Sequence, residues 1–330
     1  MFKKIRRVSS IVALRSRGLW RAAINIACMK CRMPVAPCLP LYITIEPTAF
    51  CNLRCTVCET GNKSIKRQQG VMSMDDFKLV IDKIAFHTNT LLLYFMGEPF
   101  LNKSIYDMIA YARGKGIYVC MCTNGELMDA ERLALSGINE VSFQVGGTTQ
   151  DVHAEYREGA NLGATMGKLK ELLEAKKRLG KTKMSVEVGF IVMKHNEHQI
   201  DGFVKEAEAM GVDRIHVIKP RVRTIEEARR FLPKDGKYWL YDKNEYDRGV
   251  LAPAKNKRSL DRCFMLWNSA AITWNGDLVP CCNDPHGRFV MGNILKEDMK
   301  DIWNNERYRG LRRALLNGRK SSPLCGTCVE

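Results

Sequence analysis

Three cysteines with short, regular spacing carry the first chemistry that this sequence offers. Cys51, Cys55 and Cys58 are separated by three and then two residues. Cysteine thiolates are the usual ligands of iron-sulfur clusters, and a cube of four irons normally takes four of them. A compact set of three with no fourth cysteine nearby therefore predicts a [4Fe-4S] cluster with one iron left for a small molecule. Zinc is the alternative, because cysteines at short spacing also form zinc sites.

A second set of cysteines lies toward the carboxyl end of the sequence. Its members are Cys263, Cys281, Cys325 and Cys328. Between the first two, the segment Ala271 to Pro280 contains an Asn-Gly pair that predicts a β-hairpin, which would bring its two ends together. A helix from Leu295 to Leu316 would return the last two cysteines to the first two. Four such ligands suit zinc and an iron-sulfur cluster equally well, and we expect Cys282 not to be a ligand.

Alternating strand and helix patterns must position the first cysteines. Six apolar segments have the length of strands, and these are Tyr42–Ile45, Thr90–Met96, Ile117–Cys122, Glu140–Val145, Met184–Val192 and Arg214–Ile218. Helical patterns separate them, among them 102–115, 165–179 and a helix that begins after Ser73. Continuous apolar strands are typical of a parallel sheet covered by helices, whose sites lie at the carboxyl ends of the strands. The three cysteines follow the first strand.

Polar groups follow the next strands at the same edge of the expected sheet. Gly97, Glu98 and Pro99 follow the second strand, where a glycine lets the backbone approach a ligand closely and a carboxylate comes next. Three further candidates are Thr123 and Asn124 at the end of the third strand and Ser142 in the fourth. Arg157 comes shortly after the fourth strand. A ligand at this edge would meet the backbone at Gly97 and the carboxylate of Glu98.

The cysteine spacing and the strand-end motifs together resemble the radical S-adenosylmethionine (SAM) enzymes, whose CxxxCxxC signature follows the first strand of a partial (β/α)₆ barrel. The resemblance implies that SAM chelates the open iron and is cleaved to a 5′-deoxyadenosyl radical. It also implies that Gly97, Glu98 and Pro99 contact SAM, although Met96 replaces the first glycine of the family motif. Thr123, Asn124, Ser142 and Arg157 correspond to further SAM contacts. Val57 and Gly146 depart from the residues that relatives often carry there.

The carboxyl-terminal cysteines resemble the twitch domain, a shortened form of the SPASM domain of radical SAM enzymes. This resemblance implies a second, auxiliary [4Fe-4S] cluster held by the four cysteines named above. The expected fold class is therefore α/β, with a partial (β/α)₆ TIM-like barrel followed by a small α+β domain. The expected division is a basic amphipathic arm (1–40), the barrel (41–220), a linker (221–262) and the auxiliary domain (263–330).

The amino-terminal arm is basic and partly apolar. The chain has a net charge of +16, and nine of its Lys and Arg residues precede the first acidic residue, Glu46. Such a segment can lie on an anionic membrane surface; a helix packed on the barrel and a disordered leader are alternatives. No stretch has the length of a membrane span, and charges interrupt any signal sequence. Nucleic acid binding is not expected, because no groove-reading motif is present. The thirteen cysteines in metal spacings favour a reducing cytoplasm.

The sequence specifies the radical chemistry more closely than the substrate. We expect hydrogen abstraction that leads to oxidation or bond formation on a small metabolite, a sugar or a lipid-linked molecule. The alternatives are a peptide maturase and a two-cluster electron carrier without SAM chemistry. An external donor such as flavodoxin or ferredoxin would supply electrons. Asp277, Asp284 and His286 are candidates for a base.

Overall fold

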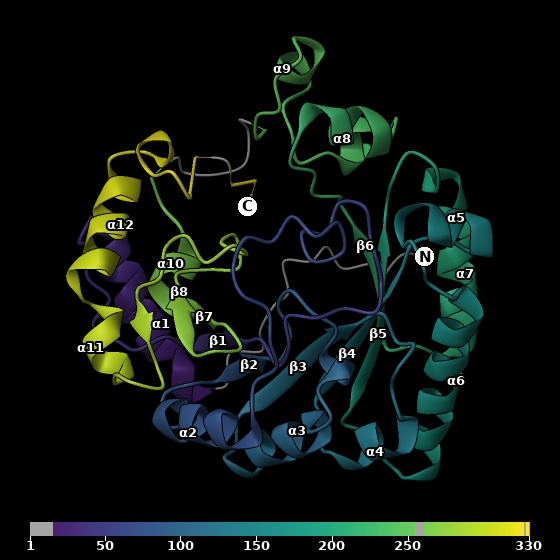
Figure 1. Ribbon diagram of the computed structural model, residues 1–330, viewed down its shortest axis with the longest axis horizontal. Coiled ribbons are helices and arrows are strands. Elements are labelled where there is room, and N and C mark those ends of the chain that lie inside the picture. The colour runs from purple at the N-terminus through teal and green to yellow at the C-terminus, as the bar shows by residue number, and fades with distance from the viewer. Residues whose placement is uncertain (1–15, 255–260, 327, 330) are drawn as a thin grey trace.

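A nine-stranded sheet with helices along its outer face organises the computed structural model, which describes residues 16–254, 261–326 and 328–329 (Figure 1). The strand order is β6-β5-β4-β3-β2-β1-β7-β8-β9. From β1 to β6 each strand pairs in parallel with the next in the sequence. This singly wound order, with helices between the strands, confirms the expected α/β fold and its barrel-like sheet.

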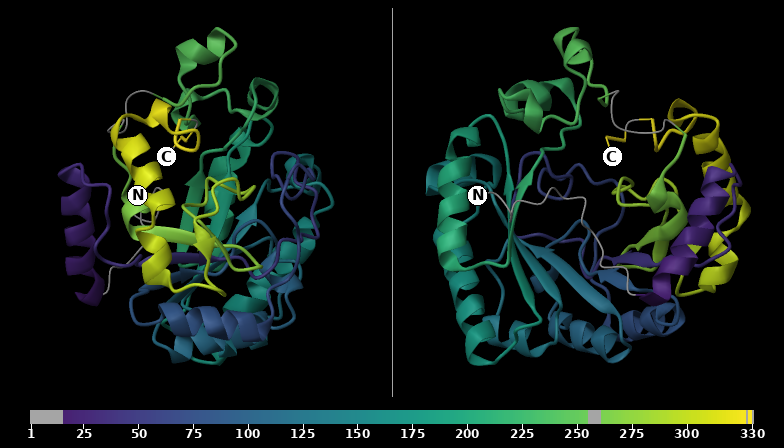
Figure 2. Two further views of the ribbon diagram at one scale, coloured as in Figure 1. Left: turned by 60° about the vertical axis from the view of Figure 1, so that its left-hand side comes forward. Right: turned by 180° about the vertical axis from the view of Figure 1, so that it is seen from behind.

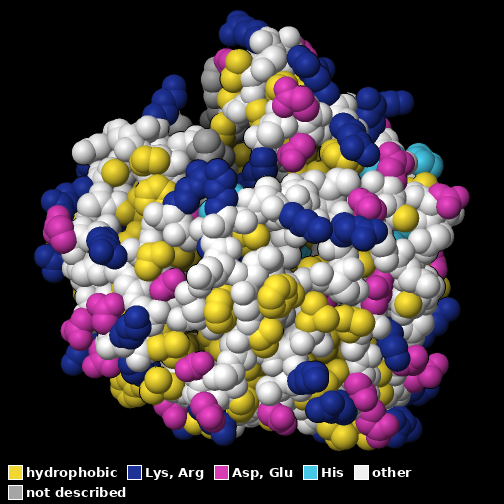
Figure 3. All heavy atoms as spheres, viewed as in Figure 1, with side chains coloured by type: hydrophobic (Ala, Val, Ile, Leu, Met, Phe, Trp, Pro, Cys, Tyr) yellow, Lys and Arg dark blue, Asp and Glu magenta, His cyan; other side chains and the backbone are white. Residues whose placement is uncertain are grey.

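The parallel strands and their helices alternate along the chain. The strands are β1 (Tyr42–Ile45), β2 (Thr90–Leu92), β3 (Tyr118–Thr123), β4 (Glu140–Val145), β5 (Ser185–Ile191) and β6 (Arg214–Ile218). The helices are α2 (Met74–Ile84), α3 (Ile105–Gly114), α4 (Ala130–Leu135), α5 (Gln150–Tyr156), α6 (Leu162–Arg178) and α7 (Ile200–Met210). The Ser73 side chain caps α2, as expected, by accepting a hydrogen bond from the Asp76 N–H. Charged side chains of both signs are interspersed along the rim formed by α2, α3 and α4 (Figure 3).

The two faces of the parallel strands are chemically distinct, which differs from the continuous apolar strands that we expected. The outward side chains, such as Val141, Phe143 and Val188, are buried in one hydrophobic core with the helices. The inward side chains at alternating positions are largely polar, and Glu140 and Gln144 keep partial contact with solvent. Successive side chains of a strand point to opposite faces. The inner face of the sheet is therefore polar, whereas a closed barrel would be filled by apolar layers. We call the barrel interior that this face borders the polar chamber.

The carboxyl-terminal hairpin continues the barrel sheet. The expected Asn-Gly hairpin is present: β7 (Ser269–Ile272) and β8 (Asp277–Val279) pair antiparallel, and Gly276 has a φ of 83° at the turn. β7 also pairs in parallel with β1, and β9 (Gly292–Asn293) pairs with β8. The short helix α10 (Phe264–Asn268) precedes β7. The auxiliary segment thus shares the sheet of the barrel instead of forming a separate layer.

The expected long helix from 295 to 316 is two helices. α11 (Met299–Trp303) ends before Asn305, and α12 (Glu306–Leu316) begins after it. The Asn305 side chain accepts a hydrogen bond from the Tyr308 N–H at 3.1 Å, which caps α12. Asparagine favours such caps over helix interiors, so the chain turns at this residue.

The segment 221–262, expected to be a linker, contains structure of its own. It forms α8 (Ile225–Phe231) and α9 (Lys243–Asp247), which stand above the barrel in Figure 1. A small hydrophobic cluster joins Phe231 and Tyr241 of this segment to Val57 of the cysteine loop. Arg223 also forms an ion pair with Glu59, with Nε and Oε1 2.8 Å apart. The segment is therefore packed against the loop that carries the first cysteines.

The described part of the amino-terminal arm is the helix α1 (Ser16–Lys30), while residues 1–15 lie outside the described residues. Ala22 of α1 packs with Leu41 and Tyr42, and Asn25 is fully buried. Asn25 Nδ2 donates to the Trp267 and Cys38 carbonyls at 2.8 and 2.9 Å, and the Cys38 N–H donates to Asn25 Oδ1 at 3.0 Å. Among the described helices, none is long and apolar enough to cross a membrane.

The Asn25 contacts predict a measurable loss of stability. Replacing Asn25 with Ala leaves buried groups of Cys38 and Trp267 without partners, which should lower the free energy of unfolding by about 2–4 kcal/mol. Urea unfolding followed by tryptophan fluorescence measures this. Ala23→Ser, at an exposed position of the same helix, is the control and should unfold like the wild type. Equal stability of both variants would show that α1 is not anchored through Asn25.

Candidate functional site

The three amino-terminal cysteines share one loop at the carboxyl end of β1. Cys55 is buried with Leu53 and Ala160, and the half-buried Cys51 and Cys58 pack against the same group. Burial raises the pKa of Cys51 to about 12, and the nearby charges of Glu98, Cys55 and Cys58 add to this effect. Burial also raises the pKa of Cys55. Such thiols ionise readily only when a metal centre stabilises the thiolates.

Hydrogen bonds between backbone groups hold the cysteine loop against the segment after α5. The Arg54 N–H donates to the Glu158 carbonyl at 2.9 Å, and the Thr56 N–H donates to the Tyr156 carbonyl at 3.2 Å. Gly61 lies so close to this loop that an added Cβ would stand 2.5 Å from the backbone N and O of Cys55. The positions of the three cysteines are therefore set by backbone contacts on both sides of the loop.

The donor set fits an iron-sulfur cube. Across the described residues, no group of three or more His, Cys, Asp or Glu side chains has the geometry for holding one metal ion. In a [4Fe-4S] cube each thiolate binds a different iron, so the sulfurs need not converge on one point. Three loop thiols with a partly open surface match this requirement.

The second strand ends in a tight backbone approach beside the cysteine loop. An added Cβ at Gly97 would lie 2.1 Å from the Thr48 carbonyl oxygen and 2.6 Å from that of Phe50, so no larger side chain fits. The Glu98 N–H donates to the Phe50 carbonyl at 2.8 Å, which joins the two loops. Pro99 then begins a short 3₁₀ turn, Pro99–Leu101. Gly97 is thus required by packing as well as by any ligand.

Glu98 is the centre of a buried hydrogen-bond network. Thr123 Oγ1 donates to Glu98 Oε1 at 2.7 Å, and the Asn124 N–H donates to Oε2 at 2.9 Å. Asn124 Nδ2 also donates to Oδ1 of Asn52 in the cysteine loop at 2.8 Å. Burial raises the pKa of Glu98 to about 7, although these hydrogen bonds and Arg157 act in the opposite direction. The structure therefore brings Glu98, Thr123 and Asn124 together next to Cys51.

Arg157 is a buried cation beside the same cysteines. It is 6% exposed, and its Nε has no hydrogen-bond partner among the described residues. Its charge lowers the pKa values of Cys55 and Glu98, which places it close to both. A Cβ on Gly146 would lie 3.5 Å from Arg157 Cδ, so the glycine is a close neighbour of the guanidinium stem. A buried guanidinium that is not fully hydrogen bonded suits an anionic ligand group.

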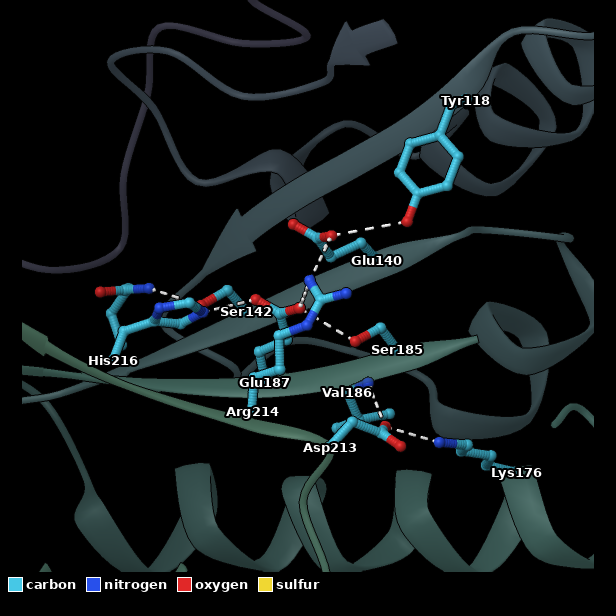
Figure 4. A network of polar contacts seen from close by, with 11 residues as sticks. Tyr118, Glu140, Ser142, Lys176, Ser185, Val186, Glu187, Asp213, Arg214 and His216 are labelled. Carbon is cyan, nitrogen blue, oxygen red and sulfur yellow. Dashed lines mark hydrogen bonds and ion pairs between the residues drawn. The ribbon is translucent and has the colours of Figure 1, made fainter. Parts of the chain in front are cut away.

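Ser142 belongs to a different part of the site from the other candidates. It lies in the chamber wall, where Gln144 Nε2 donates to Ser142 Oγ at 2.9 Å (Figure 4). Gln144 also approaches the Cys122 sulfur at 3.7 Å. In the fold, Cys122 on β3 is directly paired with Ser142 on β4. Ser142 therefore faces the barrel interior rather than the Glu98 network.

The chamber wall also contains four ionisable residues that the sequence did not reveal. Figure 4 shows them on β4, β5 and β6. Glu187 lies between His216 Nε2 at 2.7 Å and Arg214 Nη1 at 2.6 Å, and Arg214 also reaches Glu140 at 3.1 Å. Burial alone would raise the pKa of Glu187, but the contacts with His216, Ser185 and Arg214 lower it overall. The available signal was the alternation of polar residues at every second position within these strands.

The carboxyl-terminal cysteines also come together. Cys325 is buried, Cys263 precedes α10, and the Cys328 N–H donates to the Cys325 carbonyl at 3.2 Å. Burial raises the pKa values of Cys263 and Cys281, and in both cases the neighbouring thiols of the set contribute. Segments up to 65 residues apart in the sequence thus place these thiols near one another.

One tyrosine interacts both with a thiol of the barrel wall and with a thiol beside the second cysteine set. Tyr94, just after β2, hydrogen bonds with the Cys122 thiol and interacts electrostatically with Cys282. Cys282 is the exposed neighbour of Cys281.

Among the candidates for a base, Asp284 already has a structural role. Its carboxylate accepts hydrogen bonds from the N–H groups of Arg288 and Phe289 at 2.9 and 2.8 Å.

Family models match both halves of this arrangement. Residues 45–207 match the model described as the radical SAM superfamily, and residues 263–329 match SPASM, an iron-sulfur cluster-binding domain. The chain is 26% identical over 315 residues to a cofactor-modifying protein of the tungsten-containing aldehyde ferredoxin oxidoreductase of Pyrococcus furiosus, covering 87% of this chain and 86% of that one. It is 27% identical over 312 residues to the mycofactocin maturase MftC of Mycobacterium ulcerans, covering 88% and 80%.

Solved structures show the same fold at low identity. BtrN in complex with AdoMet and 2-DOIA matches with a TM-score of 0.56 and 20% identity over 88% of this chain and 93% of that one. Streptococcus suis SuiB bound to SAM matches with a TM-score of 0.61 and 16% identity over 94% and 76%. The matched domains bind a [4Fe-4S] cluster with SAM and an auxiliary iron-sulfur cluster. The chain therefore belongs to the radical SAM superfamily of enzymes and carries a SPASM domain at its carboxyl end.

Proposed function

We propose that this radical SAM enzyme oxidises, or forms a bond on, a small hydroxyl-rich substrate that lies in the polar chamber of the barrel. The observation that carries this proposal is the hydrogen-bonding wall of Ser142, Gln144, Glu187 and His216. Carboxylate, amide and imidazole groups suit a sugar, a cyclitol or the head of a lipid-linked sugar. One structural relative, BtrN, has been solved with 2-DOIA bound, which is support by analogy.

The first three cysteines would hold the SAM-cleaving cluster. Cys51, Cys55 and Cys58 lie in one loop with raised pKa values for the first two. When bound, this cluster supplies the electron that cleaves SAM to methionine and a 5′-deoxyadenosyl radical. The chain's own part is to fix the loop through Gly61 and the 156–158 segment, and to exclude larger side chains at Gly97.

The neighbouring polar groups would orient SAM. The ionised carboxylate of Glu98 suits an ammonium group, and the buried guanidinium of Arg157 suits a carboxylate. Thr123 and Asn124 hold Glu98 in place by hydrogen bonds of 2.7 and 2.9 Å. Gly97 and Pro99 fix the backbone on either side of Glu98, and Ser142 would contact SAM from the chamber wall.

The second cysteine set would hold the auxiliary cluster beside the substrate. Cys263, Cys281, Cys325 and Cys328 are the proposed ligands, and this cluster supplies an acceptor for a second electron. Tyr94 hydrogen bonds with Cys122 on the barrel wall and interacts electrostatically with Cys282 next to the set, which supports electron transfer between the two regions. An external donor such as flavodoxin or ferredoxin completes the proposal. We also propose that the chain divides into the barrel (41–220), the linker (221–262) and the auxiliary domain (263–330).

A peptide maturase is the second candidate function. The relatives include mycofactocin maturase MftC and the subtilosin biosynthesis protein AlbA, and SuiB has been solved with the precursor peptide SuiA. Membership in an enzyme superfamily weighs against the electron-carrier alternative. A lipid-linked substrate would require the protein to meet a membrane surface.

The radical chemistry can be tested without a known substrate. After anaerobic cluster reconstitution and reduction with dithionite, the protein should convert SAM to 5′-deoxyadenosine, detected by chromatography and mass spectrometry. Cys55→Ala should abolish this product and lower the iron content from about eight to about four per chain. Cys281→Ala should lose iron to the same extent and still cleave SAM. Product formation by Cys55→Ala at the wild-type rate would contradict the ligand assignment.

The substrate class can be tested by the coupling of SAM cleavage to added molecules. A panel of cyclitols and aminosugars should raise the rate of 5′-deoxyadenosine formation above its background, whereas short peptides should not. Gln144→Ala should lose this stimulation and keep the background, because the side chain lies in the wall rather than in the cysteine loop. Leu135→Ala, at an exposed position of α4, is the matched control. Stimulation by peptides alone would favour the maturase.

The ion pairs of Glu187 predict a pH effect on stability. Because the pKa of Glu187 is lower in the folded chain than its usual 4.5, its contribution to stability is present above that pH and is lost as the pH falls through the lowered value. Glu187→Gln should abolish this acid-dependent part and cost about 3 kcal/mol at pH 7, since the buried carboxylate no longer pairs with Arg214 and His216.

Urea unfolding at several pH values measures this effect. The control is Glu131→Gln, which removes an exposed ion pair with Arg178 and should change stability little. Equal unfolding of the Glu187 and Glu131 variants at pH 7 would argue against the buried network.

A further inference from the structure

The outer face of α1 is apolar where a surface helix normally carries polar side chains. Exposure is described for residues 18–30 of this helix, and the exposed positions among them are Leu19, Trp20, Ala23, Ile24, Ala27 and Lys30. They recur at helical spacing and so form one stripe along the helix. Leu19, Trp20 and Ile24 are 52%, 56% and 40% exposed. Five of the six exposed residues in the described part of the stripe are therefore apolar.

The opposite face of the same helix already packs against the protein core. Ala22, Asn25 and Met29 face inward and are buried, and Asn25 is held by three hydrogen bonds shorter than 3.1 Å. Rotating α1 to bury Trp20 and Ile24 would expose Met29 and leave the groups that bind Asn25 without partners. A helix that is apolar on both faces is normally buried on both faces. We therefore expect a binding partner to cover the outer stripe.

The apolar surface extends beyond the helix. Phe86, in the turn after α2, is 89% exposed. Arg21 joins it to the stripe, since its guanidinium carbon lies 5.3 Å from the Trp20 ring centre and 5.4 Å from that of Phe86. The surface thus comprises Leu19, Trp20, Ile24 and Phe86 around one arginine, and α1 lies at the outer edge of the molecule (Figure 2, left). We call these four residues the α1 patch.

Charge indicates which partner suits the α1 patch. The segment before Glu46 carries nine Lys and Arg residues and no Asp or Glu, and α1 itself has no acidic residue in its first turn. A second copy of the chain would bring the same positive surface against itself across a symmetric interface. An anionic lipid surface attracts basic residues and accommodates tryptophan and leucine at its headgroup boundary.

We propose that the α1 patch inserts into the headgroup boundary of an anionic membrane and fixes the enzyme to that surface. Arg21, between Trp20 and Phe86, and the exposed Lys30 interact with lipid phosphates, while Trp20, Leu19, Ile24 and Phe86 enter the boundary region. Asn25 holds the helix to the fold, so the barrel is oriented relative to the membrane. This inference is independent of the substrate in the proposed function, although a lipid-linked substrate would be reached from such a position.

Vesicle flotation of the full-length protein tests this proposal. The wild type should float with vesicles of phosphatidylcholine and phosphatidylglycerol and should bind those of phosphatidylcholine alone much less. Binding to the anionic vesicles should weaken as salt is raised. The double variant Trp20→Ser/Ile24→Ser should bind at least about tenfold less tightly, because it removes two apolar side chains from the contact. Both side chains are exposed, so its thermal unfolding should match the wild type.

A matched control separates the α1 patch from apolar surface in general. Leu127→Ser/Leu135→Ser changes two exposed apolar side chains elsewhere on the barrel, 43% and 56% exposed, and should bind vesicles like the wild type. Absence of wild-type binding to anionic vesicles would overturn the proposal, as would unchanged binding of the Trp20/Ile24 variant. A wild-type dimer that the same variant converts to monomer, measured by light scattering, would assign the patch to self-association instead. None of these outcomes depends on SAM cleavage.

Discussion

The burial of thiols in one loop is the physical constraint on which the rest of this structure depends. Cys55 is almost completely enclosed and burial raises its pKa, so an isolated thiolate there would be unfavourable. Iron ions that bind the thiolates offset this unfavourable energy, so ionisation of the loop cysteines is coupled to binding of the cofactor. Burial also raises the pKa of the neighbouring Glu98 to about 7, and the positive charge of Arg157 acts in the opposite direction on both Glu98 and Cys55. The loop, the second strand end and Arg157 therefore form one electrostatic unit.

The continuity of the sheet explains why the two cysteine sets act in one molecule. β7 pairs with β1 residue for residue from Tyr42 and Ser269 onward, so the auxiliary segment begins beside the strand that leads into the first cysteine loop. The polar chamber lies on the inner side of the same sheet, and Tyr94 interacts with Cys122 on its wall and with Cys282 beside the second cysteine set. A substrate in the chamber would thus have the groups that we propose to bind SAM at the strand ends, and the second cysteine set at one side.

The sequence predicted the parts of this fold that depend on local pattern. β1, β4 and β6 have the expected bounds, and the Asn-Gly hairpin is present with Gly276 at a positive φ. The expected second strand was too long, since only Thr90–Leu92 pair in the sheet before the chain turns toward Gly97. The inward network of Glu187 and His216 was missed because their strands also carry enough apolar residues to resemble fully buried ones.

Long-range packing accounts for the other differences. Neither the pairing of β7 with β1 nor the contact of Arg223 with Glu59 leaves a signal in local periodicity. The arm was expected to be amphipathic as a whole, but α1 is apolar outside and anchored inside by Asn25. The roles of the seven cysteines remain a prediction from spacing and from family resemblance, supported by their proximity within each set.

The central claim is that SAM binds directly to an iron held by Cys51, Cys55 and Cys58. Electron paramagnetic resonance of the reduced Cys281→Ala variant, which keeps only the first cysteine set intact, tests this claim most directly. Adding SAM labelled with ¹⁷O in its carboxylate should change the g-values of the cluster and broaden its signal through hyperfine coupling. A spectrum that is identical with and without SAM would contradict the account, because the open iron would then not be the place where SAM binds.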